Sequence, residues 1–260
     1  MPASAAVTTI ERRDLVEGLG KGLRVIEAFD DDHPQLTASE AAQRAGITRT
    51  AARRYLLSLV HFGYAATDGK QFWLAPRVLR LGQSYLGAAR LPRLMQPFIQ
   101  RASVLCGHTV NASVLDDHEV VYVARSSPPR WLTIGYAVGV RVPAHVVTPG
   151  IAILSTFDDA ALKAWIEAHE FTAFTAHTVI DRKLFRAQVL QARELGYWAT
   201  EQQLDAGLSG ISVAIVDRKG RCKGAVGMTL PITVYVGRAR MVEAMLPVLR
   251  DTVQALRPLL

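Results

Sequence analysis

The chain has 260 residues, of which 50% are hydrophobic, and a formal net charge of +7 at pH 7. This length allows one or two domains with a large core, and the positive charge favours an anionic partner. Only two cysteines occur, no segment resembles a secretory signal, and no uninterrupted apolar run is long enough to cross a bilayer. These features exclude a membrane-spanning helix, and we expect a protein of the reducing cytoplasm without membrane contact.

The chain begins with small and polar residues, and residues 1–17 are expected to form a flexible tail. A first helix follows and is predicted to end at the acidic loop 30–34. Its apolar stripe is formed by Leu19, Leu23, Ile26 and Phe29. We expect this stripe to support the two helices that come next.

Residues 36–61 have the pattern of two short helices joined by a glycine turn. Thr37 or Ser39 is placed to cap the first helix, and Thr48 is placed to cap the second. Gly46 supplies the turn between them. The first helix is rich in alanine on its inner side, which allows the second helix to approach closely.

The second helix is amphipathic. Its inward face is formed by Ala52, Leu56 and Leu59, at spacings of four and three. Thr50, Arg53 and Arg54 then point outward, which suits insertion into the DNA major groove, where arginine pairs with guanine. An exposed arginine is more often solvated than functional, so the hypothesis depends on the order of cap, glycine turn, amphipathic helix and hairpin.

A β-hairpin is predicted next, because two short apolar segments, 64–67 and 71–74, flank the sequence Asp-Gly-Lys at 68–70. Residues 18–76 are therefore interpreted as a winged helix-turn-helix DNA-binding domain, with Lys70 near phosphate at the tip of the wing. The predicted DNA contacts are Ser39, Thr48, Arg49, Thr50, Arg53, Arg54, Ser58 and Lys70.

Basic residues are concentrated in and just after this domain. Between residues 36 and 93 two residues are acidic, Glu40 and Asp68, and nine are basic: Arg44, Arg49, Arg53, Arg54, Lys70, Arg77, Arg80, Arg90 and Arg93. Such an excess suits phosphate neutralisation and implies salt-sensitive binding to double-stranded DNA.

Residues 77–91 are predicted to form a linker helix, a position that commonly serves as a dimer contact. Residues 92–260 are predicted to form an α+β domain with helices on an antiparallel sheet. The expected helices are 94–106, 150–155, 158–169, 182–195 and 237–256, and the expected strands are 109–115, 120–125, 132–138, 210–217 and 222–230.

The chain resembles the IclR family of bacterial transcription regulators over nearly its whole length. The matching segments are GLGKGLRVIEAF, LTASEAAQRAGITRTAARRYLLSLVHFGYA, DGKQFWLAPRVLRLG, VGVRVPAHVVTPGIAILS and ARELGYWATEQQLDAGLSGISVAIVDRKGRCKGAVGMTL. Within the family it is most similar to the regulators that control catabolism of aromatic acids such as protocatechuate and 4-hydroxybenzoate, or of their product 3-oxoadipate. The resemblance implies a dimer or dimer of dimers on palindromic operators, and a GAF-like C-terminal domain that binds a small organic acid.

The resemblance also implies where that acid binds. Thr148 and Pro149 lie where amides at a helix start would meet a carboxylate, and Gly227 and Thr229 share one side of a strand. The expected effector contacts are Trp131, Ile134, Arg141, Val142, His145, Thr148, Pro149, Thr200, Leu208, Gly210, Gly227 and Thr229. For Arg141 and His145 a structural role, on the surface and at a strand end respectively, is an equally good reading.

The sequence departs from the family at four of these positions. Several members place an acidic residue, a cysteine and two serines where this chain has Thr200, Gly210, Gly227 and Thr229. Smaller and fewer polar groups predict more space, and hence a ligand bulkier than glyoxylate.

Two other functions remain open at this point, an enzyme acting on a small organic acid with a vestigial DNA-binding domain and a DNA-binding protein that ignores small molecules. Cys106 and His108 are near in sequence, but such neighbours rarely meet as nucleophile and base, and the histidines show no metal-binding spacing. We therefore expect no catalytic residue, metal or cofactor. Whether the chain activates or represses is not encoded in any of these features.

Overall fold

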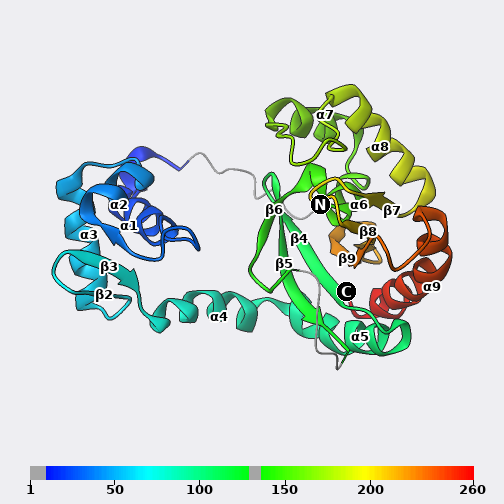
Figure 1. Ribbon diagram of the computed structural model, residues 1–260, viewed down its shortest axis with the longest axis horizontal. Helices are drawn as coiled ribbons and strands as arrows, with labels where there is room; N and C mark the ends of the chain where they lie inside the picture. The colour runs from blue at the N-terminus through cyan, green and yellow to red at the C-terminus, as the bar shows by residue number, and fades with distance from the viewer. Residues whose placement is uncertain (1–9, 129–135) are drawn as a thin grey trace. The chain divides into compact units, whose positions relative to one another are not determined.

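The computed structural model describes residues 10–128 and 136–260, and these divide into two compact units between Tyr85 and Leu86. Each unit has its own core (Figure 1). None of the helices in the described ranges is long and apolar enough to cross a membrane.

The N-terminal unit combines a helical bundle with a small sheet, whose first strand lies between α1 and α2. Its elements are η1 (Arg12–Asp14), α1 (Glu17–Glu27), β1 (Leu36–Thr37), α2 (Ala38–Ala45), α3 (Arg49–His61), β2 (Ala65–Thr67), β3 (Gln71–Leu74) and η2 (Pro76–Val78). The strands form one antiparallel sheet in the order β1-β3-β2. Val25, Leu56 and Phe72 are buried together where the three helices meet this sheet. The predicted winged helix-turn-helix is confirmed.

Local sequence accounts for the ends of α2 and α3. Thr37 forms a capping box with Glu40, in which the Thr37 hydroxyl accepts from the Glu40 amide and the Glu40 carboxylate accepts from the Thr37 amide. Gly46 ends α2 in the left-handed conformation with φ 63°, which glycine adopts without strain. Thr48 caps α3 by accepting from the Ala51 amide. Thr37 is therefore the cap, and Ser39 is not.

The predicted inward stripe is wrong at Leu19 and Leu23, whereas Phe29, just after α1, is partly buried against the core of this unit. The side chains of Leu19 and Leu23 are 66% and 44% exposed, whereas Val25 and Ala28 are buried. The inner face of the α1 segment is therefore formed by Val25 and Ala28, which are three residues apart, and not by Leu19 and Leu23. Periodicity identified an apolar face but not the face that packs against α2 and α3.

The helical segment after the wing is discontinuous. A 3₁₀ turn, η2, leads into α4 (Leu79–Ala88), in which no residue is buried, and α5 (Arg90–Cys106) begins after Ala89. The division between the two units falls within α4. The proposed linker 77–91 thus covers α4 and the start of α5.

The C-terminal unit is built on one six-stranded sheet in the order β6-β5-β4-β9-β8-β7, with every neighbouring pair antiparallel. The strands are β4 (Val110–Asp116), β5 (Glu119–Ser126), β6 (Arg141–Pro143), β7 (Trp198–Glu201), β8 (Leu208–Val216) and β9 (Cys222–Pro231). In the central strands β4, β8 and β9 consecutive residues are buried, and because successive side chains point to opposite faces, both sides of the sheet are covered.

Helices cover both faces of this sheet (Figure 1). They are α5, η3 (Ala144–Val146), α6 (Thr148–Leu154), α7 (Asp159–Ala168), α8 (Arg182–Leu195), α9 (Arg238–Leu256) and η4 (Arg257–Leu259). One core lies where α5 and α9 pack on the sheet, around Ile99, Ile211 and Leu249. The other lies where α6 and α8 pack, around Ile151 and Phe185. The predicted α+β organisation is confirmed.

Short elements account for most of the differences in this unit. The strands β6 and β7 were not predicted, because three or four residues are too few to display a period of two. The expected strand 132–138 falls mostly outside the described residues, and residues 136–138 are not in a strand. The helix expected at 150–155 begins at Thr148 instead.

Candidate functional site

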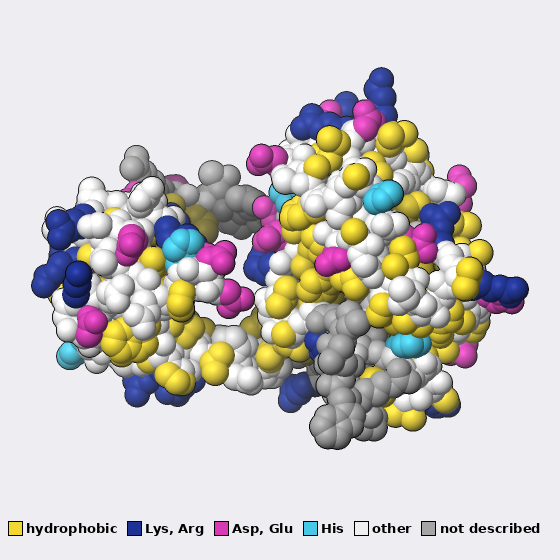
Figure 2. Space-filling model, in the orientation of Figure 1, with side chains coloured by type: hydrophobic (Ala, Val, Ile, Leu, Met, Phe, Trp, Pro, Cys, Tyr) yellow, Lys and Arg dark blue, Asp and Glu magenta, His cyan; other side chains and the backbone are white. Residues whose placement is uncertain are grey.

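The first candidate site is the outward surface of α3. All eight predicted DNA contacts are exposed: Ser39, Thr48, Arg49, Thr50, Arg53, Arg54, Ser58 and Lys70. The opposite face of α3 is held in the core by Ala52 and Leu56, so the helix cannot turn this surface inward without losing its packing. Figure 2 shows Lys and Arg side chains grouped on the surface of this unit.

The basic residues of this unit divide into two groups. Arg44 donates to the Ala28 carbonyl at 2.6 Å and pairs with Asp30, and Arg77 donates to the Phe62 carbonyl at 2.8 Å. These two arginines therefore tie the unit together. The three arginines of α3, by contrast, form no ion pair with any residue that the structure describes.

The charge on α3 is unfavourable for the isolated helix. Arg49 occupies its first position and its first turn contains no acidic residue, although a helix N-terminus favours negative charge. A positive charge at the N-terminal end of a helix opposes the helix dipole, and a residue that is unfavourable for local structure in this way is typical of a functional surface. The combination of free N-terminal amides and guanidinium groups suits a polyanion.

The wing is shaped by its turn. The Asp68 carboxylate accepts from the amides of Lys70 and Gln71 at 2.8 and 2.7 Å, and these hydrogen bonds lower the pKa of Asp68. Gly69 has φ 96°, which only glycine adopts readily. Lys70 is exposed at the tip of this turn, as predicted.

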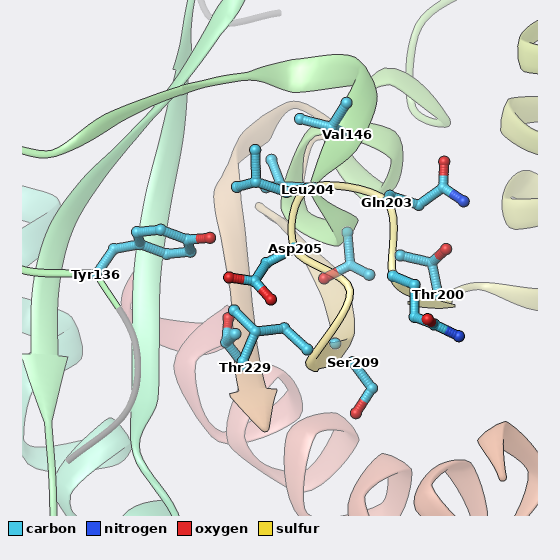
Figure 3. A pocket seen from close by; sticks show the side chains of 13 residues that line it. Tyr136, Val146, Thr200, Gln203, Leu204, Asp205, Ser209 and Thr229 are labelled. Carbon is cyan, nitrogen blue, oxygen red and sulfur yellow. The ribbon is translucent and has the colours of Figure 1, made fainter. Parts of the chain in front are cut away.

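The second candidate site is a pocket in the C-terminal unit, beside the start of α6 and the ends of β7, β8 and β9 (Figure 3). It encloses about 330 Å³ of space between atoms, including its open mouth. Its lining consists of Tyr136, Val146, Val147, Thr148, Thr200, Gln202, Gln203, Leu204, Asp205, Leu208, Ser209, Gly210 and Thr229. Five predicted effector contacts are among them: Thr148, Thr200, Leu208, Gly210 and Thr229.

A smaller niche adjoins this pocket and shares Thr148 and Thr229 with it. The niche encloses about 190 Å³ between atoms and has room for roughly one water-sized group. Its lining consists of Asn111, Ser113, Tyr122, Thr148, Pro149, Ser212, Gly227, Met228 and Thr229. The predicted contacts Pro149 and Gly227 therefore belong to the niche. Neither cavity is lined by a lysine, an arginine or a histidine among the described residues.

The hydroxyl groups of Thr148 and Ser212 link α6 to β8 across the niche, with their oxygens 2.8 Å apart. Glycine makes this approach possible. A Cβ atom at Gly227 would lie 2.0 Å from Ser212 Oγ, and one at Gly210 would lie 3.2 Å from Thr148 Oγ1. The expectation that Gly227 leaves more space for ligand is wrong, because Ser212 fills that space.

Two tyrosines form the aromatic side of the site. The rings of Tyr122 and Tyr136 stack with centroids 4.9 Å apart and an interplanar angle of 28°. Burial raises the pKa of both hydroxyls, and the nearby Asp205 carboxylate raises that of Tyr136 further. In Figure 3 the Tyr136 hydroxyl is directed toward the side of the pocket where Asp205 lies. Both phenols therefore remain neutral hydrogen-bond donors at physiological pH.

The start of α6 offers few free amides. Pro149 has no N–H group, and the amides of Gly150 and Ile151 both donate to the Val147 carbonyl, at 3.1 and 3.4 Å. The expected cradle of backbone amides is therefore replaced by side-chain hydroxyls, above all that of Thr148.

Three predicted effector contacts lie away from the pocket. Arg141 is on the surface, where it pairs with Asp116 at 2.8 Å and Glu119 at 2.7 Å. Val142 packs in the core beside α6. The structure thus agrees with the surface alternative for Arg141. Trp131 and Ile134 lie outside the described residues.

His145, the third of these, is buried in an aromatic cluster. Its Nδ1 is 2.8 Å from His169 Nε2, and its Nε2 is 3.0 Å from the Thr172 carbonyl oxygen. Burial lowers the pKa of both histidines, and that of His169 falls to about 4 because His145, His118 and Arg182 also oppose a positive charge there. His145 does not cap a strand end. Its role in this structure is in packing.

Sequence reasoning missed one whole wall of the site. Asn111 and Ser113 are two residues apart, and the residues at 110, 112, 114 and 115 are apolar. A polar pair at the strand period is a signal that could have identified them. Tyr122 faces Ser113 across β4 and β5. The loop residues 202–205 carry no periodic signal, and only the chain path brings them to the pocket.

Comparison with known proteins shows which family of proteins this chain is related to. The model of the IclR helix-turn-helix domain matches residues 18–69, and that of the bacterial transcriptional regulator IclR C-terminal domain matches residues 83–257. The chain is 36% identical over 255 residues to the p-hydroxybenzoate hydroxylase transcriptional activator of Acinetobacter baylyi, covering 96% of this chain and 94% of the relative. It is 30% identical to the Pca operon regulatory protein of the same organism, covering 96% and 91%.

Solved structures agree with this relationship. A transcriptional regulator from Rhodococcus sp. RHA1 is 34% identical and superposes with a TM-score of 0.81, covering 94% of this chain and 98% of that one. An IclR homologue from Microbacterium hydrocarbonoxydans, solved in complex with 4-hydroxybenzoate, shares the fold with a TM-score of 0.75 at 23% identity, covering 93% and 98%. With both domains matched in order, this chain belongs to the IclR family of bacterial transcriptional regulators.

Proposed function

We propose that this protein is a one-component regulator that binds an operator in double-stranded DNA through α3 and the wing, and that a small aromatic acid bound beside α6 controls it. The observation that carries the proposal is the outward face of α3, where Thr50, Arg53 and Arg54 are exposed while Ala52 and Leu56 hold the helix in its unit. This face is extended by five further exposed residues: Thr48 and Arg49 at the helix start, Ser39, Ser58 and Lys70.

We assign the parts of this surface different tasks. Arg53 reads a base in the major groove, and Lys70 contacts phosphate from the wing. Ser58 donates its hydroxyl to the Arg54 carbonyl at 2.8 Å, so its oxygen remains available as an acceptor. The phosphate contacts position the helix, and Arg53 contributes sequence preference.

The chemistry of the pocket supports an aromatic acid as the effector. The stacked Tyr122 and Tyr136 provide a surface for a ring, and the hydroxyls of Thr148, Ser212 and Thr229 provide donors and acceptors. Because the cavity lining described includes no cation, a compact dicarboxylate would lose much of its hydration without compensation. The names of the relatives, which refer to p-hydroxybenzoate and to the Pca operon, point to the same class.

Control of DNA binding requires the effector to prefer one arrangement of the molecule. We infer a homodimer, or a dimer of dimers, on a palindromic operator, because two copies of α3 must enter successive grooves. The exposed Leu79, Leu81 and Tyr85 of α4 support an association of this kind. The effector then changes the population of dimer arrangements that fit the operator spacing.

The experiment has two parts. Full-length protein is used to select duplexes from a random library, and 4-hydroxybenzoate binding is measured separately by isothermal titration calorimetry. We expect an enriched palindromic sequence and saturable binding of the acid. Selected duplexes that share no common sequence would contradict operator recognition. The absence of binding heat with any aromatic acid would contradict the effector assignment. Consumption of the acid during the titration would instead indicate an enzyme.

A further inference from the structure

Asn111 is a buried polar residue that the fold does not explain. Its side chain is 3% exposed, and neither its amide oxygen Oδ1 nor its amide nitrogen Nδ2 has a hydrogen-bond partner in the described protein. Most buried side-chain amides are paired. An unpaired buried amide destabilises the fold, because its hydration is lost and no hydrogen bond replaces it.

The position of Asn111 connects it to the candidate site. It lines the niche together with Tyr122, Thr148 and Ser212. Its partner in the β4–β9 register is Gly227, which has no side chain to hydrogen-bond with the amide. The neighbouring hydroxyls of Thr148 and Ser212 already bond to each other. The amide is therefore left for a group that enters the niche.

We propose that Asn111 recognises a hydroxyl group on the ring of the aromatic effector. This inference depends on the function proposed above and goes further, because it names the substituent that the site selects and the residue that selects it. The ring hydroxyl enters the niche, and the ring lies in the larger pocket beside Tyr136.

The hydrogen-bonding capacity of the amide favours a hydroxyl over a carboxylate. A phenolic hydroxyl donates to Oδ1 and accepts from Nδ2, and so satisfies both atoms. A carboxylate only accepts, which would leave Oδ1 unpaired next to a negative charge. The niche also has room for roughly one water-sized group and no cation in its described lining. The carboxylate of the effector therefore stays toward the open end of the larger pocket.

The test compares two acids of similar shape, 4-hydroxybenzoate and 4-methylbenzoate, by calorimetry with the full-length wild type and Asn111→Leu. We expect the wild type to bind the hydroxylated acid more tightly, and Asn111→Leu to reduce that preference by about 10- to 100-fold. Thr252→Val, in α9 and outside the lining of both cavities, is the control and should leave the preference unchanged. Asn111→Ala provides a second variant if leucine prevents folding.

Thermal unfolding without ligand separates this role from a structural one. Because Asn111→Leu removes an unpaired buried amide, we expect its Tm to be equal to or higher than that of the wild type. If Asn111→Leu has a lower Tm and binds both acids more weakly by the same factor, Asn111 has a structural role, and the inference is overturned. If the wild type binds both acids equally, the inference fails while the proposed function stands. If it binds neither acid, the proposed function itself fails.

Discussion

Gly227 gives the sharpest test of how the proposed effector site is built. A Cβ atom at this position would lie 2.0 Å from Ser212 Oγ and 2.7 Å from the Ile211 carbonyl oxygen. Real Cβ contacts are not this short, so Gly227→Ala must displace both β8 and the Ser212 side chain. Since Ser212 bonds to Thr148, the displacement also disturbs the start of α6.

The size of the effect follows from overpacking in a buried sheet. Inserting a methyl group into a closed site costs about 1–3 kcal/mol, which for a unit of this size lowers Tm by roughly 2–12 °C. Ser212→Gly in the same chain removes the 2.0 Å contact but leaves the backbone contact with Ile211. We therefore expect the double variant to recover only part of the loss.

Differential scanning calorimetry of the full-length protein measures this. Gly82→Ala is a suitable control, because Gly82 lies in α4 with nothing within 4 Å of its Cβ position, and alanine in a helix is more favourable than glycine. A Gly227→Ala protein as stable as the wild type would refute the packing described for β8, β9 and α6.

Three further predictions concern DNA, effector and pH. Arg53→Ala should weaken operator binding by about 1–3 kcal/mol in fluorescence anisotropy if Arg53 reads a base, while Arg218→Ala, which removes an exposed arginine of the other unit, should have a much smaller effect. Thr229→Phe should abolish the heat of effector binding and leave operator affinity intact, since it fills the space shared by pocket and niche. The pKa of His169 is about 4 in the folded protein, against an ordinary value of 6.5. At pH values between 4 and 6.5 the unfolded chain therefore binds more protons than the folded one. Stability should therefore fall by up to roughly 3 kcal/mol as the pH drops from 6.5 to 4, and His169→Gln should flatten this dependence in urea titrations.

Each of these has an outcome that contradicts it. Equal losses for Arg53→Ala and Arg218→Ala would mean that Arg53 acts only through charge. Effector binding that survives Thr229→Phe would place the ligand elsewhere. An acid dependence that is unchanged by His169→Gln would assign the destabilisation to other groups, of which His145 is the nearest.

The N-terminal unit was predictable because its signals are local. The caps at Thr37 and Thr48, the left-handed Gly46 and the Asp68 turn each depend on a few neighbouring residues. The error on α1 has the opposite origin. Leu19 and Leu23 form an apolar face as clear as the one that is buried, and only contacts with α2 and α3 decide between them.

The proposed effector site was predictable only in part, because its residues come from five strands, the helical segments η3 and α6, and the loops between elements. Thr148, Gly210 and Thr229 line the candidate pocket, and their contact with an effector stays a prediction. Arg141 and His145 were predicted because either side chain could pair with an acid. In the structure Arg141 forms ion pairs with Asp116 and Glu119. His145 is instead buried against His169. The selective residue that we propose, Asn111, lacks any charge or motif, and its unpaired amide is visible only in three dimensions.

The central claim is that one chain couples the outward face of α3 to the pocket beside α6. The most direct test is the affinity of the full-length protein for its selected operator, measured by fluorescence anisotropy with and without saturating 4-hydroxybenzoate. We expect this affinity to change by about fivefold or more, in either direction, and we expect no change in Thr229→Phe. An operator affinity that is identical with and without an acid shown to bind would contradict it.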